Sequence, residues 1–305
     1  MDKTLHSLAE YLKLLDDQHL VSEYDIKTEN QNSLVHYISF NSMDIEKDTL
    51  FVCKGSHFSV DYLTSAIKKG ASCYISETKY DPGKLPVGSV SYIIVKDIRK
   101  AMALIADYYY NQIWKDLKVI GVTGTKGKST TAYFMKFILD DYLKEKKKPL
   151  CAIISGIDNY DGIINEESHL TTPEAMELHK HFSNAVKSNI EYLSMEVSSQ
   201  ALKYDRTLGI TFDVGCFLNI GEDHISDVEH SSFDDYLDSK LKIFSQCRMV
   251  CVNSNSDHID RVLEASKACP HVVTFGLDEK ADVYGYDIVK SGKTISFMVR
   301  TKDFI

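Results

Sequence analysis

The sequence predicts an α/β protein of two domains, the second of which is built on a doubly wound, mostly parallel sheet. Strand-like and helical runs alternate along the chain, as they do where crossover helices connect parallel strands. At 305 residues the chain is long enough for about two domains with substantial cores. The run KVIGVTGTKGKSTT, from Lys118 to Thr131, has the pattern of a strand, a glycine-rich turn and the start of a helix.

The first domain is expected to cover residues 1–113, with the boundary near Trp114. An apolar pattern at helical spacing opens it, and short apolar runs then alternate with two helices, the first of which stops at Gly70. The expected strands are residues 35–40, 50–53, 72–76 and 92–95. The expected helices are residues 5–15, 61–69 and 99–114. This order of elements indicates an α/β domain.

The second domain, residues 114–305, continues the alternation on both sides of the glycine-rich turn. Its expected strands are residues 119–122, 150–155, 192–197, 212–219, 249–253 and 272–275. Its expected helices run from the turn to residue 143 and over residues 174–188, 233–246 and 257–267. A hairpin of residues 283–289 and 294–299 is expected near Ile305.

Composition restricts the class of protein. A net charge of -9 argues against a nucleic acid as the main partner, and the lysine-rich stretch at residues 144–148 reads as a solvated helix end. The seven cysteines show no CxxC spacing, which is typical of reduced cytosolic thiols. The sequence shows no signal peptide and no apolar run of membrane length. We therefore expect a cytoplasmic protein with neither a nucleic acid nor a membrane as partner.

The glycine-rich turn at Gly124–Thr130 has the chemistry of a phosphate cradle. Glycines let backbone N–H groups approach phosphate oxygens, the following helix presents its positive end, and Lys128 adds a charge. The Ser129 hydroxyl is a candidate Mg²⁺ ligand, so a nucleoside triphosphate is the natural guest. The spacing departs from the standard phosphate loop, which would place a glycine at Val122. A glycine-rich turn without any ligand is the alternative.

Polar residues follow two of the expected strands, at Glu196–Ser199 and Asn219–His224. Ligands of open α/β sheets bind outside the carboxyl ends of the strands, so both stretches are expected to face the glycine-rich turn. A carboxylate such as Glu196 would complete a Mg²⁺ site, with the His224 imidazole as a further ligand. The alternative for His224 is an ordinary loop residue.

Lys240 stands on the apolar side of an expected helix that opens with an S-x-x-D capping box at Ser232. At about 100° per residue, Lys240 falls in the middle of an apolar stripe. The stripe consists of Phe233, Tyr236, Leu237, Leu241 and Phe244. A lysine in such a stripe costs desolvation unless it is paired or neutral, which favours a functional role. A side chain that snorkels to solvent is the alternative.

Five segments of the chain follow one another in a defined order: GVTGTKGKSTT, LTTPEAMEL, MEVSSQALKYDR, FDVGCFLNIGEDH and YLDSKLKIF. Taken alone, the second segment is only a helix start, with a threonine cap and a proline at the first helical position. Taken together, the segments resemble the Mur ligases, and within them the MurE type, which adds the third residue of the peptidoglycan stem peptide. HFSVDYL, at His57–Leu63, is similar to the N-terminal UDP-binding domain of that family.

The resemblance implies a UDP-binding domain followed by a P-loop ATP-binding domain. It implies that ATP phosphorylates the D-glutamyl carboxylate of UDP-N-acetylmuramoyl-L-alanyl-D-glutamate. The amine of a free amino acid would then attack the acyl phosphate to give an amide, ADP and phosphate. The Thr-Lys-Gly-Lys loop and HFSVDYL look most like the lysine-adding enzymes, which favours L-lysine over meso-diaminopimelate. A cytoplasmic monomer that acts in cell wall synthesis, and so in cell shape and division, is expected.

The resemblance also implies roles for single residues. Catalysis would depend on Lys128, Glu196, His224 and Lys240. ATP would be bound by Gly124, Thr125, Lys126, Gly127, Lys128, Ser129 and Thr130. Mg²⁺ would be bound by Ser129, Glu196, His224 and Lys240, the last as a carbamate formed with CO₂. The dipeptide part of the substrate would contact Thr171, Thr172, Ser198 and Arg206, and its uridine end would contact Ser42.

The chain departs from the family pattern in several places. Asn41-Ser42-Met43 replaces a frequent Asp-Ser-Arg, Ser129 replaces the commoner threonine, and Ser155–Gly162 is unusual for the branch. A third, C-terminal domain, which completes the ATP site in the family, is not recognised in the sequence, and the central domain is expected to end early. A fragment or a truncated relative is therefore expected.

Two other functions remain open at this stage. One is a ligase similar to folylpolyglutamate synthase, which the TTPE and EVSSQ stretches disfavour. The other is a catalytically silent module that binds a nucleotide or the UDP-linked substrate.

Overall fold

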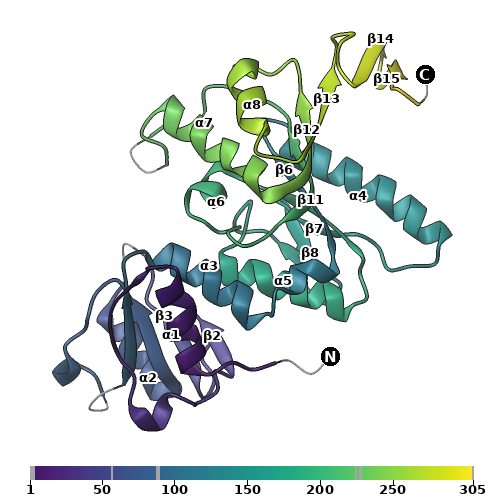
Figure 1. Ribbon diagram of the computed structural model, residues 1–305. Helices are drawn as coiled ribbons and strands as arrows, with labels where there is room; N and C mark the ends of the chain where they lie inside the picture. Colours follow the sequence, from purple (N-terminus) through teal and green to yellow (C-terminus); the bar gives the residue numbers. More distant parts are fainter. Residues whose placement is uncertain (1–3, 56–57, 87–89, 224, 227–228, 304–305) are drawn as a thin grey trace. The chain divides into compact units, whose positions relative to one another are not determined.

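The computed structural model describes residues 4–55, 58–86, 90–223, 225–226 and 229–303 (Figure 1). The chain folds as two compact units. The first consists of Met1–Ile113, Glu174–Lys180 and Tyr204–Gly209, and the second of Trp114–Pro173, His181–Lys203 and Ile210–Ile305. The sequence suggests a boundary near Trp114 but assigns the two later segments of the first unit to the second domain. The first unit is thus assembled from three separate stretches of chain.

The first unit is a five-stranded sheet with helices on both faces. Its strands lie in the order β1-β5-β4-β3-β2, and neighbouring strands are parallel except for β1 and β5. The strands are β1 (Val21–Asp25), β2 (Tyr37–Ser39), β3 (Thr49–Val52), β4 (Ala71–Ser76) and β5 (Ser91–Val95), and the helices are α1 (Leu8–Asp17), α2 (Val60–Lys69) and α3 (Ile98–Tyr109). Successive side chains of a strand point to opposite faces, so Leu50 and Val52 pack with α1 and α3, whereas Phe51 packs with α2.

The first unit differs from the sequence-based expectation in two elements. Strand β1 is not expected, because four of its five residues are exposed and it lacks an apolar pattern. Helix α3 ends at Tyr109 and not near Trp114. Asn111 and Gln112 have φ angles of 52° and 55°, and this left-handed backbone cannot continue a right-handed helix.

The second unit is a ten-stranded sheet in the order β15-β14-β13-β12-β11-β6-β10-β7-β8-β9. In this spatial order, all neighbouring strands between β14 and β7 are parallel. At the two ends, β15 pairs with β14, β8 with β7 and β9 with β8 in antiparallel fashion. The strands are β6 (Lys118–Thr123), β7 (Ala152–Ile154), β8 (Asp158–Tyr160), β9 (Asn165–Glu167), β10 (Tyr192–Glu196), β11 (Phe212–Phe217), β12 (Cys247–Asn253), β13 (His271–Gly276), β14 (Val283–Ser291) and β15 (Thr294–Arg300).

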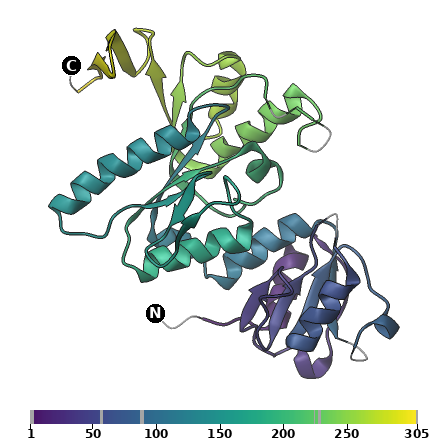
Figure 2. The ribbon, with the colours of Figure 1, turned by 180° about the vertical axis from the view of Figure 1, so that it is seen from behind.

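Helices cover both faces of this sheet, which confirms the doubly wound fold. Helix α4 lies on one face, whereas α7 and α8 lie on the other (Figure 2). The helices are α4 (Lys128–Glu145), α6 (Ser199–Lys203), α7 (Phe233–Leu241), α8 (Ile259–Ser266) and the second part of α5 (Ala175–Lys187), whose residues 175–180 belong to the first unit. Across the described ranges, no helix has both the length and the apolarity that a membrane crossing requires.

Short elements account for the differences from expectation in the second unit. Strands β8 and β9 and helix α6 are not expected, because three to five residues are too few to show a period. The helix expected over residues 233–246 is divided: α7 ends at Leu241, and the 3₁₀ helix η4 (Lys242–Gln246) follows. The expected capping box is also only half formed, because Asp235 N donates to Ser232 Oγ while the Asp235 carboxylate accepts from Ser231 N.

Asp161 fixes the β8–β9 hairpin to α5. The side chain is fully buried, and its Oδ1 accepts from the backbone N–H groups of Ile163 at 2.9 Å and Ile164 at 2.6 Å. Its Oδ2 lies 2.7 Å from His181 Nδ1 and accepts from Asn184 Nδ2 at 2.9 Å. One carboxylate therefore satisfies four polar groups from two elements.

We predict that Asp161→Ala lowers the free energy of unfolding by about 3 kcal/mol, because it leaves several buried donors without an acceptor. Urea denaturation of the purified chain measures this loss. The matched control is Asp141→Ala, which removes an exposed carboxylate paired with Lys144 and should change stability by less than about 0.5 kcal/mol. A loss at Asp161 no larger than that of the control would contradict the prediction.

Candidate functional site

A tight loop connects β6 to α4 at the carboxyl edge of the parallel sheet. Strand β6 lies between β10 and β11, so the loop emerges in the middle of the sheet. A Cβ on Gly124 would lie 2.9 Å from the Leu218 Cβ, which leaves room only for glycine. Gly127 has a φ of 85° and is the N-cap of α4, whose first turn therefore receives no side-chain cap. The loop thus presents the positive end of a helix, which suits an anion.

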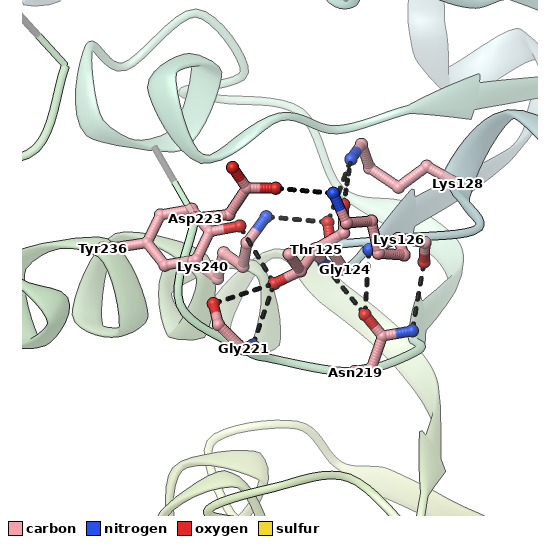
Figure 3. Close-up of polar contacts among 9 residues, drawn as sticks. All are labelled: Gly124, Thr125, Lys126, Lys128, Asn219, Gly221, Asp223, Tyr236 and Lys240. Carbon is pink, nitrogen blue, oxygen red and sulfur yellow. Dashed lines mark hydrogen bonds and ion pairs between the residues drawn. The ribbon is translucent and has the colours of Figure 1, made fainter. Parts of the chain in front are cut away.

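Asn219 determines the shape of this loop. It lies just beyond β11, and its Oδ1 accepts from the N–H groups of Thr125 at 3.1 Å and Lys126 at 2.9 Å (Figure 3). Its Nδ2 donates to the Lys126 carbonyl at 3.0 Å. One amide side chain thus bonds to both N–H and carbonyl groups of the loop backbone. The residue after β11 therefore supports the loop that follows β6.

Thr125 connects the loop to α7. The side chain is buried, and its Oγ1 lies 3.0 Å from the Tyr236 hydroxyl and accepts from Gly221 N at 3.0 Å. Tyr236 belongs to the same apolar stripe as Lys240, so the contact places this face of α7 against the loop.

Two lysine side chains meet at the carbonyl oxygen of Gly124. Lys240 Nζ donates to it at 2.9 Å from α7, and Lys128 Nζ donates to it at 3.0 Å from the first turn of α4 (Figure 3). Lys128 Nζ also donates to the Thr125 carbonyl at 3.2 Å. Lys240 is 1% exposed, so its side chain does not snorkel to solvent.

The surroundings of these two amines lower the pKa of both. Burial, and after it the Lys128 charge, lowers the pKa of Lys240 to about 7, and the Asp223 carboxylate opposes the shift only in part. Burial also lowers the pKa of Lys128, against the attraction of Glu196 and Asp223. Near neutral pH a large fraction of Lys240 is therefore an uncharged amine.

A third lysine, Lys126, forms an ion pair with Asp223. Its Nζ lies 2.9 Å from Asp223 Oδ2, and the two side chains are 82% and 33% exposed. A surface ion pair of this kind contributes little to stability. It does hold the stretch that follows β11 against the loop.

Glu196 ends β10, beside the loop strand β6, and is buried. Its Oε1 accepts from the Gly156 N–H at 2.8 Å. A Cβ on Gly156 would lie 3.3 Å from the Thr171 hydroxyl. The backbone N–H of Gly156 therefore fixes one oxygen of the Glu196 carboxylate.

Thr172 lies before the N-cap position of α5, which begins at Ala175, and not at it as expected from sequence. Its hydroxyl donates to the Glu196 carbonyl at 2.9 Å and accepts from Ser198 N at 3.0 Å. Ser198 Oγ in turn accepts from Ala201 N at the start of α6. The structure therefore brings Thr171, Thr172, Glu196 and Ser198 together at the end of β10.

The remaining candidate metal ligands are only partly described. The Ser129 side chain is half-buried and that of Thr130 is exposed, both on the first turn of α4. His224 lies outside the described residues, so its expected role cannot be placed. Within the described part of the chain, no three His, Cys, Asp or Glu side chains gather at the spacing of metal ligands. Serine hydroxyl and carboxylate oxygens remain as donors of the kind that Mg²⁺ prefers.

The other two expected substrate residues belong to the first unit. Ser42 follows β2, and its carbonyl accepts from Lys69 Nζ at 2.8 Å. Arg206 Nη2 lies 2.9 Å from Glu174 Oε1, in one of the two late segments that join this unit.

Each unit has a cavity at the carboxyl ends of its strands. That of the second unit measures about 340 Å³ and lies beyond β12 and β13, with apolar walls and the amides of Asn253 and Asn255. Asn253 also donates to the Leu218 carbonyl at 2.9 Å, next to the glycine-rich loop. That of the first unit measures about 280 Å³ and includes Glu77, Asp97 and Arg99.

Sequence reasoning missed three residues that shape the site: Asn219, Tyr236 and Glu174. Asn219 was part of a predicted polar stretch, but its contacts depend on the pairing of β6 with β11. Tyr236 had been assigned only to the apolar stripe, and its hydroxyl gave no separate signal. Glu174 read as part of a helix start.

The fold and the loop define a doubly wound α/β protein with a P-loop-type domain. Residues 122–304, more than half of the chain, match the Mur ligase middle domain. The chain therefore belongs to the Mur ligase family.

Relatives of this chain carry names from that family. A protein of Streptococcus agalactiae serotype V, named UDP-N-acetylmuramoyl-L-alanyl-D-glutamate–L-lysine ligase, is 39% identical over 302 residues, which cover 97% of this chain and 58% of the relative. A protein of Lactobacillus acidophilus, named UDP-N-acetylmuramyl-tripeptide synthetase, is 38% identical over 85% of this chain and 49% of its own length. This chain thus spans about half the length of these relatives.

Solved structures show the same fold. A UDP-N-acetylmuramoyl-L-alanyl-D-glutamate–2,6-diaminopimelate ligase aligns with a TM-score of 0.76 at 20% identity, over 99% of this chain and 58% of the other. MurF of Thermotoga maritima, solved with ADP, aligns with a TM-score of 0.55 at 20% identity, over 88% and 57% of the two chains.

We predict that Lys240→Met stabilises the chain at pH 6 and that this advantage shrinks as the pH rises. Below a pKa of about 7 the folded chain must bury a charged amine, whereas the unfolded chain keeps its lysine protonated until near its ordinary value. The parent therefore gains stability relative to the variant as the pH rises above about 7, by roughly 2 kcal/mol between pH 7 and pH 9.

Urea denaturation in CO₂-depleted buffer at pH 6, 7.5 and 9 measures this difference. The control is Lys242→Met, which removes an exposed lysine two residues further along the chain and is compared with the parent at the same three pH values. A Lys240→Met difference that is constant over this range would contradict the prediction.

Proposed function

We propose that the chain acts as an ATP-dependent amide-bond ligase on UDP-N-acetylmuramoyl-L-alanyl-D-glutamate, with an acyl phosphate as intermediate and L-lysine as the favoured amino acid. Membership of the Mur ligase family and the names of the relatives support this reaction. The observation that carries the proposal is the buried Lys240 amine at the glycine-rich loop. A simple phosphate cradle does not need a second, desolvated lysine at this point.

ATP fits the loop and its surroundings. The uncapped first turn of α4 and the Lys128 ammonium suit the triphosphate, with Gly124–Thr130 as the cradle. The apolar cavity beyond β12 and β13 is large enough for a planar base, and Asn253 in its wall also donates to the Leu218 carbonyl. Lys128 would leave the loop carbonyls and follow the phosphoryl group, whose charge it stabilises during transfer.

Mg²⁺ fits the oxygen donors at the same edge. Ser129 and Glu196 would be ligands, with His224 as a third, and the Gly156 N–H would hold one oxygen of the Glu196 carboxylate in place. When bound, the ion would neutralise phosphate charge and polarise the acceptor carboxylate.

A carbamate on Lys240 would resolve the conflict between the two buried lysines. When the uncharged amine attacks the carbon of CO₂, a C–N bond forms, a C=O π bond opens and the nitrogen releases a proton to solvent, so a neutral amine becomes an anion. The anion would attract Lys128, which the ammonium repels, and it would add oxygen ligands for Mg²⁺.

Five residues would contact the substrate. Thr171, Thr172 and Ser198 at the end of β10 would contact the dipeptide, as would Arg206, and Ser42 would contact the uridine end. The proposal also assigns the reaction to a monomer in the cytoplasm, where the seven free cysteines would stay reduced.

The test is release of ADP from ATP with UDP-N-acetylmuramoyl-L-alanyl-D-glutamate and L-lysine. Release should require all three compounds and should fall at least about tenfold when meso-diaminopimelate replaces L-lysine, because a site that excludes a charged group discriminates strongly. Binding of the UDP-linked substrate without ADP release would support the silent module in place of the ligase. Equal rates with both amino acids would contradict the choice of L-lysine.

In a chain that shows this activity, Lys240→Ala should reduce ADP release by at least about a hundredfold, because the site loses an electrostatic contributor to the transition state. Added acetate should restore part of the rate, since a small carboxylate can occupy the position of the carbamate. Formamide, which has a similar size and no charge, is the control and should restore nothing. Full activity of Lys240→Ala would contradict the carbamate.

A further inference from the structure

The hydroxyl of Tyr133 connects helix α4 to the turn between β7 and β8. Tyr133 is half-buried, and its hydroxyl donates to Asp158 Oδ1. Burial, and after it the hydrogen bond to Asp158, raises the pKa of Tyr133 to about 12, so the hydroxyl keeps its proton and acts as the donor. A charge-assisted hydrogen bond between two side chains therefore joins the helix to the turn.

Ser155 closes this turn. It is fully buried, its hydroxyl donates to the Asp158 carbonyl at 2.9 Å, and the same hydroxyl accepts from the N–H groups of Ile157 and Asp158, each at 3.1 Å. The backbone adds a bond from Ser155 N to the Asp158 carbonyl at 3.1 Å. Because the turn is closed on itself in this way, the position of Asp158 fixes the position of Gly156 within it.

Gly156 extends this constraint to Glu196. The Gly156 N–H donates to Glu196 Oε1 at 2.8 Å, and Glu196 is 1% exposed at the end of β10. Strand β10 lies between β6 and β7 in the sheet. A continuous path of hydrogen bonds therefore runs from α4 through the β7–β8 turn to a buried carboxylate.

Ser129, a ligand of the proposed Mg²⁺ site, belongs to the same helix as Tyr133. It precedes Tyr133 by four residues on α4, which places the two side chains on one face of the helix. Ser194 Oγ of β10 also donates to the Ala132 carbonyl at 3.1 Å, which fixes α4 to the strand that carries Glu196. The Tyr133 hydroxyl thus connects the helix face that carries Ser129 to the turn that holds Glu196.

We infer that Tyr133 is a positioning residue of the Mg²⁺ site, because its bond to Asp158 holds Glu196 in place relative to Ser129. This inference rests on the nucleotide and Mg²⁺ site of the proposed function. Groups that orient a metal ligand without touching the metal typically change metal affinity about 10- to 100-fold when they are removed.

A purely structural role for Tyr133 makes a different prediction. If its hydroxyl only fastens α4 to the sheet, its loss lowers stability and weakens nucleotide binding equally with and without Mg²⁺. If it positions Glu196, its loss weakens nucleotide binding only when Mg²⁺ contributes to that binding. The measurement that separates these roles is the affinity for a non-hydrolysable ATP analogue, in EDTA and at increasing concentrations of Mg²⁺.

Isothermal titration calorimetry of the analogue at each Mg²⁺ concentration tests the inference. Tyr133→Phe keeps the ring and should raise the Mg²⁺ concentration of half-maximal effect about tenfold, while the affinity in EDTA stays that of the parent. The matched control is Tyr142→Phe, which removes an exposed hydroxyl from the same helix and should leave the Mg²⁺ dependence unchanged. Melting curves check that each variant is folded.

Variants of Asp158 test the same bond from its other end. Asp158→Ala should raise the required Mg²⁺ concentration as Tyr133→Phe does, and the double variant should be no worse than Asp158→Ala alone, because both changes remove one bond. Asp158→Asn keeps an acceptor for the Tyr133 hydroxyl and should retain most of the Mg²⁺ affinity.

The outcomes separate the inference from the function. An unchanged Mg²⁺ dependence in Tyr133→Phe, an equal loss of affinity in EDTA, or additive losses in the double variant would overturn the inference while the proposed function stands. The expected shift in a parent that releases no ADP with the substrates would support the inference and reject the ligase. A parent that binds the analogue no better with Mg²⁺ than in EDTA, or does not bind it, would reject the Mg²⁺ site and the inference together.

Discussion

The candidate site of the second unit is organised around the carbonyl oxygen of Gly124, which accepts hydrogen bonds from two lysine amines. In a buried place two ammonium groups so close together repel strongly, and only the loss of one charge or the arrival of anions relieves the repulsion. The strand, the loop and α7 are nevertheless packed so that both amines are held there. Stability has been sacrificed at the loop, as is typical of sites that are completed by a charged ligand.

Much of the fold could be predicted because most of its strands and helices show a regular spacing of apolar residues along the sequence. The alternation of buried strands and amphipathic helices indicated the doubly wound sheet, and Gly70 correctly marked the end of α2. The elements that escaped prediction, such as β8, β9 and α6, are too short for any period. The end of α3 was misplaced because the left-handed backbone at Asn111 and Gln112 leaves no clear mark on the sequence.

The candidate site was predictable where one residue conflicts with its surroundings. Lys240 was identifiable because a cation stood in an apolar stripe, and its burial confirms that interpretation. Asn219 was not, because its amide acts through the pairing of two strands that are distant in sequence. Glu174 was taken for part of a helix start, because nothing in its neighbours indicates that Lys54 and Arg206 will meet it. The roles of all the expected site residues stay predictions, those of Lys128, Glu196 and Lys240 included.

The assembly of the first unit from three stretches has a consequence for modularity. The backbone passes from one unit to the other five times, at residues 113–114, 173–174, 180–181, 203–204 and 209–210. A fragment that stopped at Ile113 would lack Ala175 and Met176 from its core and would leave Lys54 without its carboxylate. The units are therefore compact in space but not interchangeable as genetic cassettes, and recombination at the apparent boundary would separate residues that fold together.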